Sequence, residues 1–212
     1  MKKLRIGILG IQGDIEENSD AIKEALKELQ IEGSVIFLKK FADISEIDGI
    51  IIPGGESTVI GTLLFLHRVQ LELLKNKIEN GLPVLGTCAG LILLANKAYD
   101  RTIGETKQQL LEALNITVER NAFGRQKDSF ETQLSIPILG EDPFKGVFIR
   151  GPAITDIGEN VQVLTKLDNK IVAVQQNNII ATSFHPELAN DIRLHKSFLT
   201  MCLKYSNSRK NL

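Results

Sequence analysis

The first ninety residues alternate between short aliphatic runs and segments in which apolar side chains recur at helical spacing. The aliphatic runs lie at residues 4–9, 35–38, 49–52 and 83–86, and the helical segments at 14–29 and 69–80. Strands without a polar face are typical of parallel sheets that helices cover on both sides. Parallel neighbours also need long crossover connections, which helices commonly provide. The alternation therefore predicts an α/β domain built on a largely parallel sheet.

Local signals mark the ends of the two helical segments. Asp14 and Glu17 have the three-residue spacing of a capping box, so we expect the Asp14 side chain to cap the first helix. Gly81 is expected to end the second helix in a left-handed conformation. The spacing of apolar residues predicts that one side of the first helix is buried. The residues on that side are Ile15, Ile22, Ala25, Leu26 and Leu29.

The second half of the chain is richer in strand signals. Strand candidates lie at residues 116–120, 130–136, 146–149, 161–164 and 179–184. Asp168-Asn169 and Asn177-Asn178 separate three β-rich runs at hairpin spacing, and asparagine tolerates the positive φ of tight turns. The stretch from Lys97 to Gln109 has the weakest pattern and is expected to be a surface excursion.

These elements predict one domain over residues 1–206. It is expected to have three layers, with a largely parallel central sheet and an antiparallel extension in its second half. A final helix at 191–205 closes the domain, and residues 207–212 are expected to form a solvated tail. The chain of 212 residues, 43% of them hydrophobic, is long enough to bury one substantial core.

Composition excludes several classes of protein. Lysine and arginine (25) nearly balance aspartate and glutamate (26), and the formal charge of -1 gives no general attraction to nucleic acid or to an anionic membrane. Two cysteines, Cys88 and Cys202, are too few for a disulfide framework. No apolar run approaches the roughly 20 residues that span a bilayer. We therefore expect a cytoplasmic protein without nucleic-acid or membrane partners.

Cys88 lies in the segment 86–90 (Gly-Thr-Cys-Ala-Gly), between a buried strand and an aliphatic helical stretch. Glycines on both sides of a nucleophile at a strand-to-helix turn form a nucleophile elbow, here with cysteine in place of serine. The helix N-terminus favours thiolate over thiol, and the backbone N–H of Ala89 can meet a developing oxyanion. A small buried core cysteine is the alternative, but it leaves the flanking glycines unexplained.

His185 is the candidate for the base that a cysteine nucleophile requires. Of the other two histidines, His67 is expected on a helix surface and His195 on the polar face of the last helix. His185 ends a buried strand, precedes Pro186, and has Glu187 two residues further on, where an extended chain places both side chains on one side. Glu187 can then hold the imidazole in one tautomer, although an unrelated surface glutamate is the alternative. The sequence contains neither HExxH nor paired CxxC, so no metal site and no cofactor are expected.

The segment 53–58 (Pro-Gly-Gly-Glu-Ser-Thr) follows another predicted strand, at the sheet edge where open α/β folds bind ligands. Gly54 and Gly55 allow the backbone to approach a ligand closely, so an amide here can act as a second oxyanion donor. The spacing does not match a phosphate-binding P-loop. Taken alone, the segment is better explained as a tight turn with Ser57 capping the next helix.

Together, the motifs at 53–58, 86–90 and 183–187 resemble the class I, triad-type glutamine amidotransferases, whose fold is flavodoxin-like. Within that superfamily the chain closely resembles the glutaminase subunits of pyridoxal 5′-phosphate synthase. The segments 9–13, 119–131 and 147–150 carry the narrower resemblance, which extends over nearly the whole chain. The first loop (14–18) lacks the histidine that is common in this family, and Gly151 replaces a usual alanine.

The resemblance implies hydrolysis of L-glutamine to L-glutamate and ammonia by a triad of Cys88, His185 and Glu187. It further implies that the amides of Gly55 and Ala89 bind the oxyanion. The residues that it places around glutamine are Gly54, Gly55, Glu56, Arg120, Ile149 and Arg150. The implied partner is a separate (β/α)-barrel synthase subunit, which uses the ammonia to make pyridoxal 5′-phosphate in a complex of twelve plus twelve chains.

Two other functions remain open from the sequence. Another triad glutaminase, such as the one that serves imidazole glycerol phosphate synthase, would share the triad but not the segment 120–131. A binding module on the same fold would have no need of an intact triad.

Overall fold

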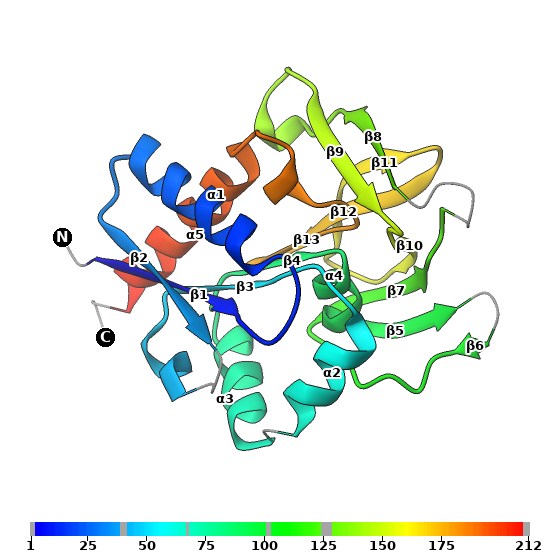
Figure 1. The fold of residues 1–212 in the computed structure, drawn as a ribbon, viewed down its shortest axis with the longest axis horizontal. Helices are drawn as coiled ribbons and strands as arrows, with labels where there is room; N and C mark the ends of the chain where they lie inside the picture. Colours follow the sequence, from blue (N-terminus) through cyan, green and yellow to red (C-terminus); the bar gives the residue numbers. More distant parts are fainter. Residues whose placement is uncertain (1–2, 39–41, 67, 101–102, 124–128, 210–212) are drawn as a thin grey trace.

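The computed structural model describes residues 3–38, 42–66, 68–100, 103–123 and 129–209 (Figure 1). Strands and helices alternate through the first half, as predicted. The elements of this half are β1 (Leu4–Leu9), α1 (Ile15–Glu28), β2 (Gly33–Leu38), the 3-10 helix η1 (Ala42–Glu46), β3 (Gly49–Ile52), α2 (Ser57–Phe65), α3 (Arg68–Glu79), β4 (Val84–Thr87) and α4 (Ala89–Leu94).

The second half consists mostly of strands. Its elements are β5 (Ala95–Asp100), β6 (Gly104–Glu105), β7 (Leu114–Arg120), β8 (Ser129–Leu134), η2 (Pro137–Leu139), β9 (Phe144–Ile149), β10 (Ala153–Ile157), β11 (Gln162–Leu167), β12 (Lys170–Gln176), β13 (Ile179–Thr182), η3 (Pro186–Leu188) and α5 (Arg193–Ser208). No described helix is long and apolar enough to cross a membrane.

The main sheet has the strand order β2-β1-β3-β4-β13-β12-β10-β7-β5-β6, with β11 attached to β12. The first five strands in this order are mutually parallel. Strand β12 runs antiparallel to its neighbours and begins the predicted antiparallel extension. The hairpin turns on either side of β12 have positive φ at Asp168, Asn169 and Asn177, as the sequence indicates. Strands β8 and β9 form a separate two-stranded sheet.

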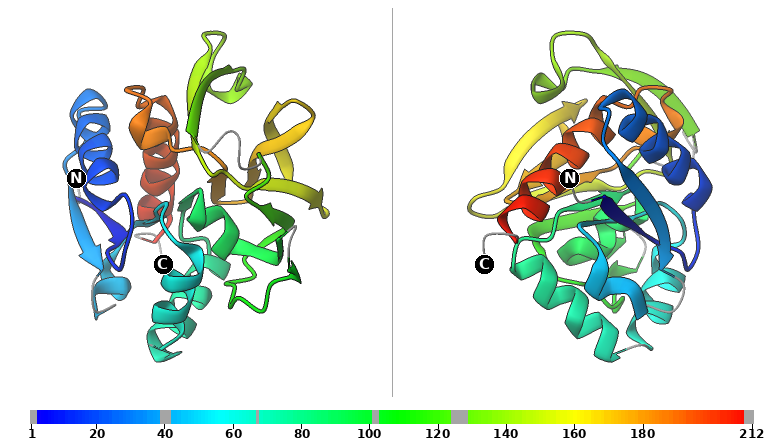
Figure 2. Two further views of the ribbon diagram at one scale, coloured as in Figure 1. Left: turned by 45° about the vertical axis from the view of Figure 1, so that its right-hand side comes forward. Right: turned by 90° about the vertical axis from the view of Figure 1, so that its left-hand side faces the viewer.

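Helices cover both faces of the parallel strands (Figures 1 and 2). On β3, Ile50 and Ile52 belong to the core on the side of α2, α3 and α4, while Ile51 belongs to the core on the side of α1 and α5. On β4, Val84 and Leu85 divide in the same way. Successive side chains of a strand point to opposite faces, which explains why these runs carry no polar position. The predicted three-layer α/β fold is confirmed.

In the second half, one expectation is wrong and one strand was not predicted. The stretch 97–109 is not only a surface excursion, because Lys97 to Asp100 belongs to β5, which pairs in parallel with β7. The pairing has a register shift between Ala95 and Lys97, and the irregular burial along β5 hides its period. Strand β10 also has no counterpart among the predicted strands.

The helix ends differ from the prediction at several residues. Asp14 precedes α1 but makes no capping hydrogen bond through its side chain, so the predicted capping box is absent. Gly81 has φ of +92°, which confirms the left-handed cap. Helix α5 extends to Ser208, and His195 is fully buried within it instead of lying on its polar face. His67 lies outside the described residues.

Arg193, at the start of α5, joins this helix to the segment that precedes β9. It donates hydrogen bonds to the backbone oxygens of Asp142 and Pro143, both at 2.9 Å, and to Asp191 Oδ2 at 2.6 Å. Partial burial raises the pKa of Asp191, but the hydrogen bonds and charge of Arg193 outweigh it and hold this pKa below its ordinary value. The pair therefore stabilises the folded state where Asp191 is ionised.

Replacing Arg193 by alanine is expected to lower the free energy of unfolding by roughly 1.5–3 kcal/mol at neutral pH, the range for hydrogen bonds to charged groups. A carboxyl group with a lowered folded pKa stabilises the protein above its unfolded pKa of about 3.9, and this contribution is lost as the pH falls through the folded pKa. Urea unfolding across that range should show the variant and the parent converging in acid. Lys23→Ala, which removes an exposed pair with Asp20, is the control. Equal losses in both variants would contradict the role of Arg193.

Candidate active site

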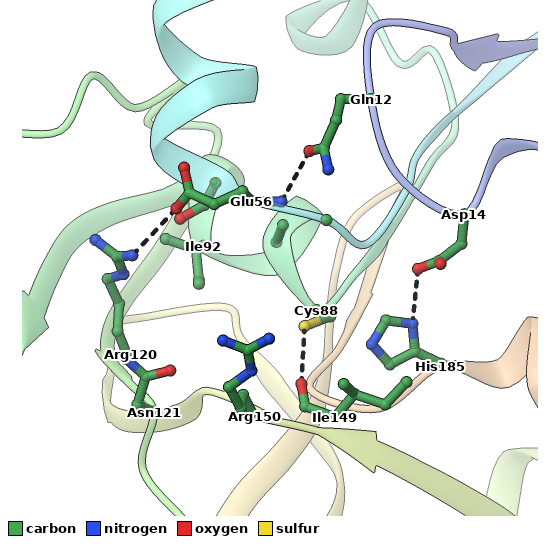
Figure 3. A pocket seen from close by; sticks show the side chains of 13 residues that line it. Gln12, Asp14, Glu56, Cys88, Ile92, Arg120, Asn121, Ile149, Arg150 and His185 are labelled. Carbon is green, nitrogen blue, oxygen red and sulfur yellow. Dashed lines mark hydrogen bonds and ion pairs between the residues drawn. The ribbon is translucent and has the colours of Figure 1, made fainter. Parts of the chain in front are cut away.

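The carboxyl ends of four adjacent parallel strands, β1, β3, β4 and β13, converge on one pocket (Figure 3). Its volume is about 410 Å³, within the range of small-molecule sites. It is lined by Gln12, Asp14, Gly55, Glu56, Ser57, Cys88, Ala89, Ile92, Arg120, Asn121, Ile149, Arg150 and His185. The three motifs that the sequence analysis selects therefore meet in space, although they are far apart in the chain.

Cys88 occupies a strained turn between β4 and α4. Its φ of 49° and ψ of -99° are rare for a residue with a side chain, as expected of a nucleophile elbow. A Cβ atom on Gly90 would lie 2.0 Å from the backbone oxygen of Ile52, and one on Gly86 would lie 2.5 Å from Leu94 Cδ1. Gly90 must therefore be glycine for the helix to pack this closely against the sheet, and the absence of a side chain at Gly86 leaves room for Leu94.

His185 is buried beside the elbow, and its backbone N–H donates a 2.8 Å hydrogen bond to Val147 of β9. Its Nδ1 atom lies 2.9 Å from Glu187 Oε1. The contact does not arise from an extended segment, because residues 186–188 form the 3-10 helix η3, which turns Glu187 back toward the ring. The other ring nitrogen, Nε2, is buried and has no hydrogen-bond partner in the described structure. It is available for a proton of Cys88 or of a substrate.

The surroundings of His185 favour its protonated form. Burial by itself lowers the pKa of His185, but the contacts with Asp14 and Glu187 and the nearby Cys88 outweigh it and raise this pKa well above its ordinary value. Burial raises the pKa of Glu187, against the hydrogen bond and charge of His185. An imidazolium next to a thiol stabilises the thiolate, which is the reactive form of cysteine. The electrostatics are those of a nucleophile and base pair.

Strand β9 contacts both Cys88 and His185. The Sγ atom of Cys88 lies 3.8 Å from the backbone oxygen of Ile149, a weak hydrogen bond (Figure 3). The backbone oxygen of Val147, two residues earlier, accepts from His185. The small β8–β9 sheet thus forms one wall of the site.

The turn at Gly54 and Gly55 lies between the first loop and the pocket. Gly55 has φ of +146° and lines the pocket, as does Ala89 in the first turn of α4. Gln12 Oε1 accepts a 2.9 Å hydrogen bond from the backbone N–H of Glu56. The two expected oxyanion donors therefore belong to segments on the same pocket as Cys88.

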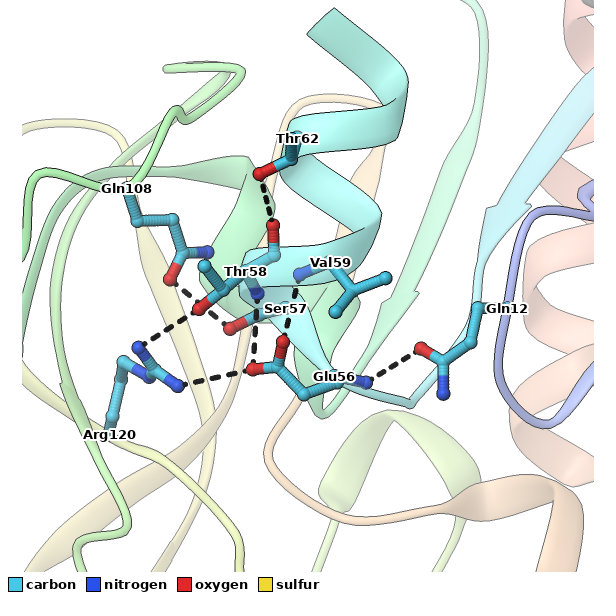
Figure 4. Close-up of polar contacts among 8 residues, drawn as sticks. All are labelled: Gln12, Glu56, Ser57, Thr58, Val59, Thr62, Gln108 and Arg120. Atoms are coloured by element: carbon cyan, nitrogen blue, oxygen red, sulfur yellow. Dashed lines mark hydrogen bonds and ion pairs between the residues drawn. The ribbon is translucent and has the colours of Figure 1, made fainter.

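Glu56, and not Ser57, caps helix α2 (Figure 4). Its carboxylate accepts hydrogen bonds from the backbone N–H groups of Thr58 at 3.2 Å and Val59 at 2.8 Å. Arg120 Nη2 lies 3.4 Å from the same carboxylate. The longer glutamate side chain reaches back over the helix terminus, which the preference of serine for capping positions does not reveal.

Of the six residues expected around glutamine, five line the pocket, namely Gly55, Glu56, Arg120, Ile149 and Arg150. Gly54 lies behind them in contact with His185, since a Cβ atom there would be 2.4 Å from His185 Cε1. Gln12, Asp14 and Asn121 also line the pocket, although the sequence motifs do not point to them. The position of Gln12 and Asp14 just after β1, at the same sheet edge, is the signal that could have found them.

Asp14, His185 and Glu187 bring potential ligand atoms within 4.8 Å of one another. Both carboxylates are at hydrogen-bonding distance from one ring nitrogen. We interpret this group as a hydrogen-bonded base with its carboxylates, since a protonated imidazole accounts for both contacts.

Known proteins match nearly the whole length of this chain. Residues 8–204 match the SNO glutamine amidotransferase family. The pyridoxal 5′-phosphate synthase subunit PdxT of Nitrosopumilus maritimus is 47% identical over 197 residues, covering 93% of this chain and 96% of that protein. The subunit of the same name from Dictyoglomus turgidum is 48% identical over 199 residues, covering 94% and 99%.

Two solved structures of glutamine amidotransferases are also similar to this chain. The crystal structure of a glutamine amidotransferase matches with a TM-score of 0.78 and 41% identity, covering 93% of this chain and 98% of that one. A glutamine amidotransferase from Thermotoga maritima has a TM-score of 0.60 at 13% identity, over 97% and 86% of the two chains, and so shares the fold. With nearly its whole length matched, the chain belongs to the SNO glutamine amidotransferase family.

Proposed function

We propose that this chain is the glutaminase subunit of a pyridoxal 5′-phosphate synthase, and that Cys88, His185 and Glu187 are its catalytic triad. The main support for the triad is the strained turn at Cys88, which lies next to the buried imidazole of His185. Nδ1 of this imidazole contacts Glu187. The names of the PdxT relatives support the choice of this synthase over other glutamine-dependent enzymes.

In the proposed reaction, the Cys88 thiolate attacks the side-chain carboxamide carbon of glutamine. The backbone amides of Gly55 and Ala89 stabilise the oxyanion. The imidazolium of His185 gives its proton to the departing ammonia, and a glutamyl thioester remains on Cys88. His185 then takes a proton from water, which hydrolyses the thioester and restores the thiolate. Glu187 keeps the ring oriented through both steps.

The charged side chains around the pocket suit the amino-acid end of glutamine. Arg120 and Arg150 offer positive charge for the α-carboxylate, and Glu56 offers negative charge for the α-ammonium group. Because Glu56 also caps α2 and contacts Arg120, its carboxylate is held in place before the substrate arrives. Gly54 shapes this turn next to the base, and Ile149 borders the thiol.

The proposed partner is a separate synthase subunit, which takes up the ammonia. Free ammonia is protonated in neutral water and is then no longer a nucleophile, so hydrolysis is useful only next to an acceptor. We propose a (β/α)-barrel subunit as that acceptor, in a complex of twelve plus twelve chains in the cytoplasm. Both cysteines are unpaired, as a reducing compartment allows.

The test of this function is ammonia release from glutamine while a pyridoxal 5′-phosphate synthase subunit is titrated in. We expect the turnover number at saturating glutamine to rise by about 100- to 1,000-fold, the effect of gaining one oxyanion donor. The structural reason is that the first loop and the glycine turn are linked, through Gln12 with Glu56 and through the Asp14 N–H with Gly54 oxygen at 3.4 Å. A partner that presses on the first loop would therefore reorient the amide of Gly55.

An imidazole glycerol phosphate synthase subunit is the control partner and should leave the turnover number unchanged. A turnover number that stays constant at every concentration of the expected partner would refute gating. Absence of ammonia release under all these conditions would refute the glutaminase function itself.

A further inference from the structure

Asp14 contacts the same nitrogen of His185 that Glu187 contacts. Its Oδ2 atom lies 3.1 Å from His185 Nδ1 (Figure 3). Glu187 Oε1 lies 2.9 Å from the same Nδ1 atom. The imidazole is 4% exposed and the Glu187 side chain is fully buried, whereas 31% of the Asp14 side chain is exposed. One buried ring nitrogen thus faces two carboxylates that come from opposite ends of the chain.

The side chain of Asp14 is turned away from its own helix. An aspartate that precedes a helix ordinarily accepts a hydrogen bond from one of the first N–H groups. Asp14 precedes α1 but makes no such bond, and its carboxylate points to His185 instead. The usual stabilising contact of a capping aspartate is therefore replaced by a contact in the active site.

Close backbone contacts bring Asp14 to this position. Gly13 has φ of +115°, and a Cβ atom on it would lie 1.7 Å from the backbone oxygen of Gly54. A Cβ atom on Gly54 would lie 2.4 Å from His185 Cε1 and 2.6 Å from Asp14 Oδ2. Side chains at either glycine would separate the first loop from the base. The absence of side chains at both positions lets the carboxylate reach the imidazole.

We propose that Asp14 is a positioning residue, which holds the imidazolium of His185 jointly with Glu187 and thereby keeps the Cys88 sulfur in its thiolate form. The proposal rests on the glutaminase function proposed above. Asp14 and Glu187 both face Nδ1 of the ring, which leaves the opposite nitrogen, Nε2, to receive the proton of the Cys88 thiol under this proposal. Since Nδ1 carries a single hydrogen, one carboxylate can accept it at full strength while the other acts mainly by its charge.

The groups that face His185 come from three elements. They are Asp14 from the first loop, Glu187 from η3 and Cys88 from the elbow. The other charged side chains that line the pocket are Glu56, Arg120 and Arg150. A negative charge near the ring favours the imidazolium, which in turn favours the thiolate. Removing the charge of Asp14 should return part of the proton from the ring to the sulfur.

The test is the rate of Cys88 alkylation by iodoacetamide as a function of pH, measured on the full chain by peptide mass spectrometry, which reports Cys88 separately from Cys202. For Asp14→Asn we expect the midpoint of this profile to rise by about one pH unit, the smaller end of the effect of a nearby charge. Below the midpoint the alkylation rate should then fall about tenfold. The turnover number for glutamine with the partner subunit should fall in proportion, while KM stays unchanged.

Asp20→Asn is the matched control. Asp20 lies in α1, the helix that Asp14 precedes, and pairs with Lys23 at the surface, so its substitution should move neither the midpoint nor the turnover number. Asp14→Ser keeps a small polar residue before α1 and serves as the second variant if Asp14→Asn does not fold.

The outcomes separate the competing roles of Asp14. An unchanged midpoint in an active, folded variant would overturn the proposal and leave Asp14 a structural residue. A rise in KM at an unchanged midpoint would also overturn it and would assign Asp14 to substrate binding. If the parent chain itself releases no ammonia with its partner, the proposed function fails, which is a different result from an active parent and an unaltered variant.

Discussion

Replacing Cys88 by alanine should abolish ammonia release from glutamine and leave the fold intact. Loss of the nucleophile in a triad hydrolase costs about 10⁶-fold in turnover, because the remaining groups act only through the nucleophile. The pocket keeps its shape, since alanine is smaller than cysteine and Cys88 is held by its backbone turn. Ammonia release at saturating glutamine, with the partner subunit present, measures the effect. Binding of glutamine by calorimetry should be preserved.

Cys202 provides the control for this experiment. It is fully buried in α5, where burial raises the pKa of its thiol well above the ordinary range and makes it unreactive. Cys202→Ala should therefore retain turnover. Severe loss of activity in a well-folded Cys202→Ala, or appreciable activity in Cys88→Ala, would show that the nucleophile has been assigned to the wrong cysteine.

The second large effect is expected for His185→Asn in the assembled complex. With glutamine as nitrogen source, pyridoxal phosphate formation should cease, because neither the thiolate nor the departing ammonia has a proton partner. With an ammonium salt at alkaline pH, the same complex should make pyridoxal phosphate, since the synthase subunit then receives ammonia directly. Product absorbance with each nitrogen source gives the comparison.

The Cys88→Ala complex should behave in the same way in this assay. Failure of His185→Asn with both nitrogen sources, while Cys88→Ala works with ammonium, would mean that His185 serves assembly or folding instead of amide hydrolysis. Undiminished product from glutamine would exclude His185 as the base.

The parallel half of the fold and the positions of Cys88 and His185 follow from the sequence because local signals suffice there. The strands around Ile51 and Leu85 are apolar on both faces, which is the direct result of burial between two helix layers. The elbow can be recognised because two glycines flank the cysteine, where the backbone of Gly86 lies close to Gly90 and that of Gly90 lies close to the adjacent strand β3. Each of these constraints restricts the residue type at its own position, so it can be recognised in the sequence.

The side-chain contacts of Asp14 and Glu56 cannot be predicted from local sequence signals. Local sequence rules predict that Asp14 caps the helix that follows it, but its carboxylate contacts His185, which is distant in the sequence. The rules favour Ser57 as the cap of α2, but the preceding Glu56 reaches the same N–H groups and also contacts Arg120. Both outcomes depend on partners far away in the sequence. Neighbouring residues do not determine these contacts. In each case two local arrangements are possible, and tertiary contacts favour one of them.

The position of strand β9 also affects the solubility of the chain. One edge of β9 pairs with β8, while on the other the backbone oxygens of Val147 and Ile149 face His185 and Cys88. An open strand edge is a template on which further chains can add and aggregate. Here His185 and Cys88 occupy part of that edge. The contacts that build this wall of the pocket therefore also cover part of an otherwise open strand edge.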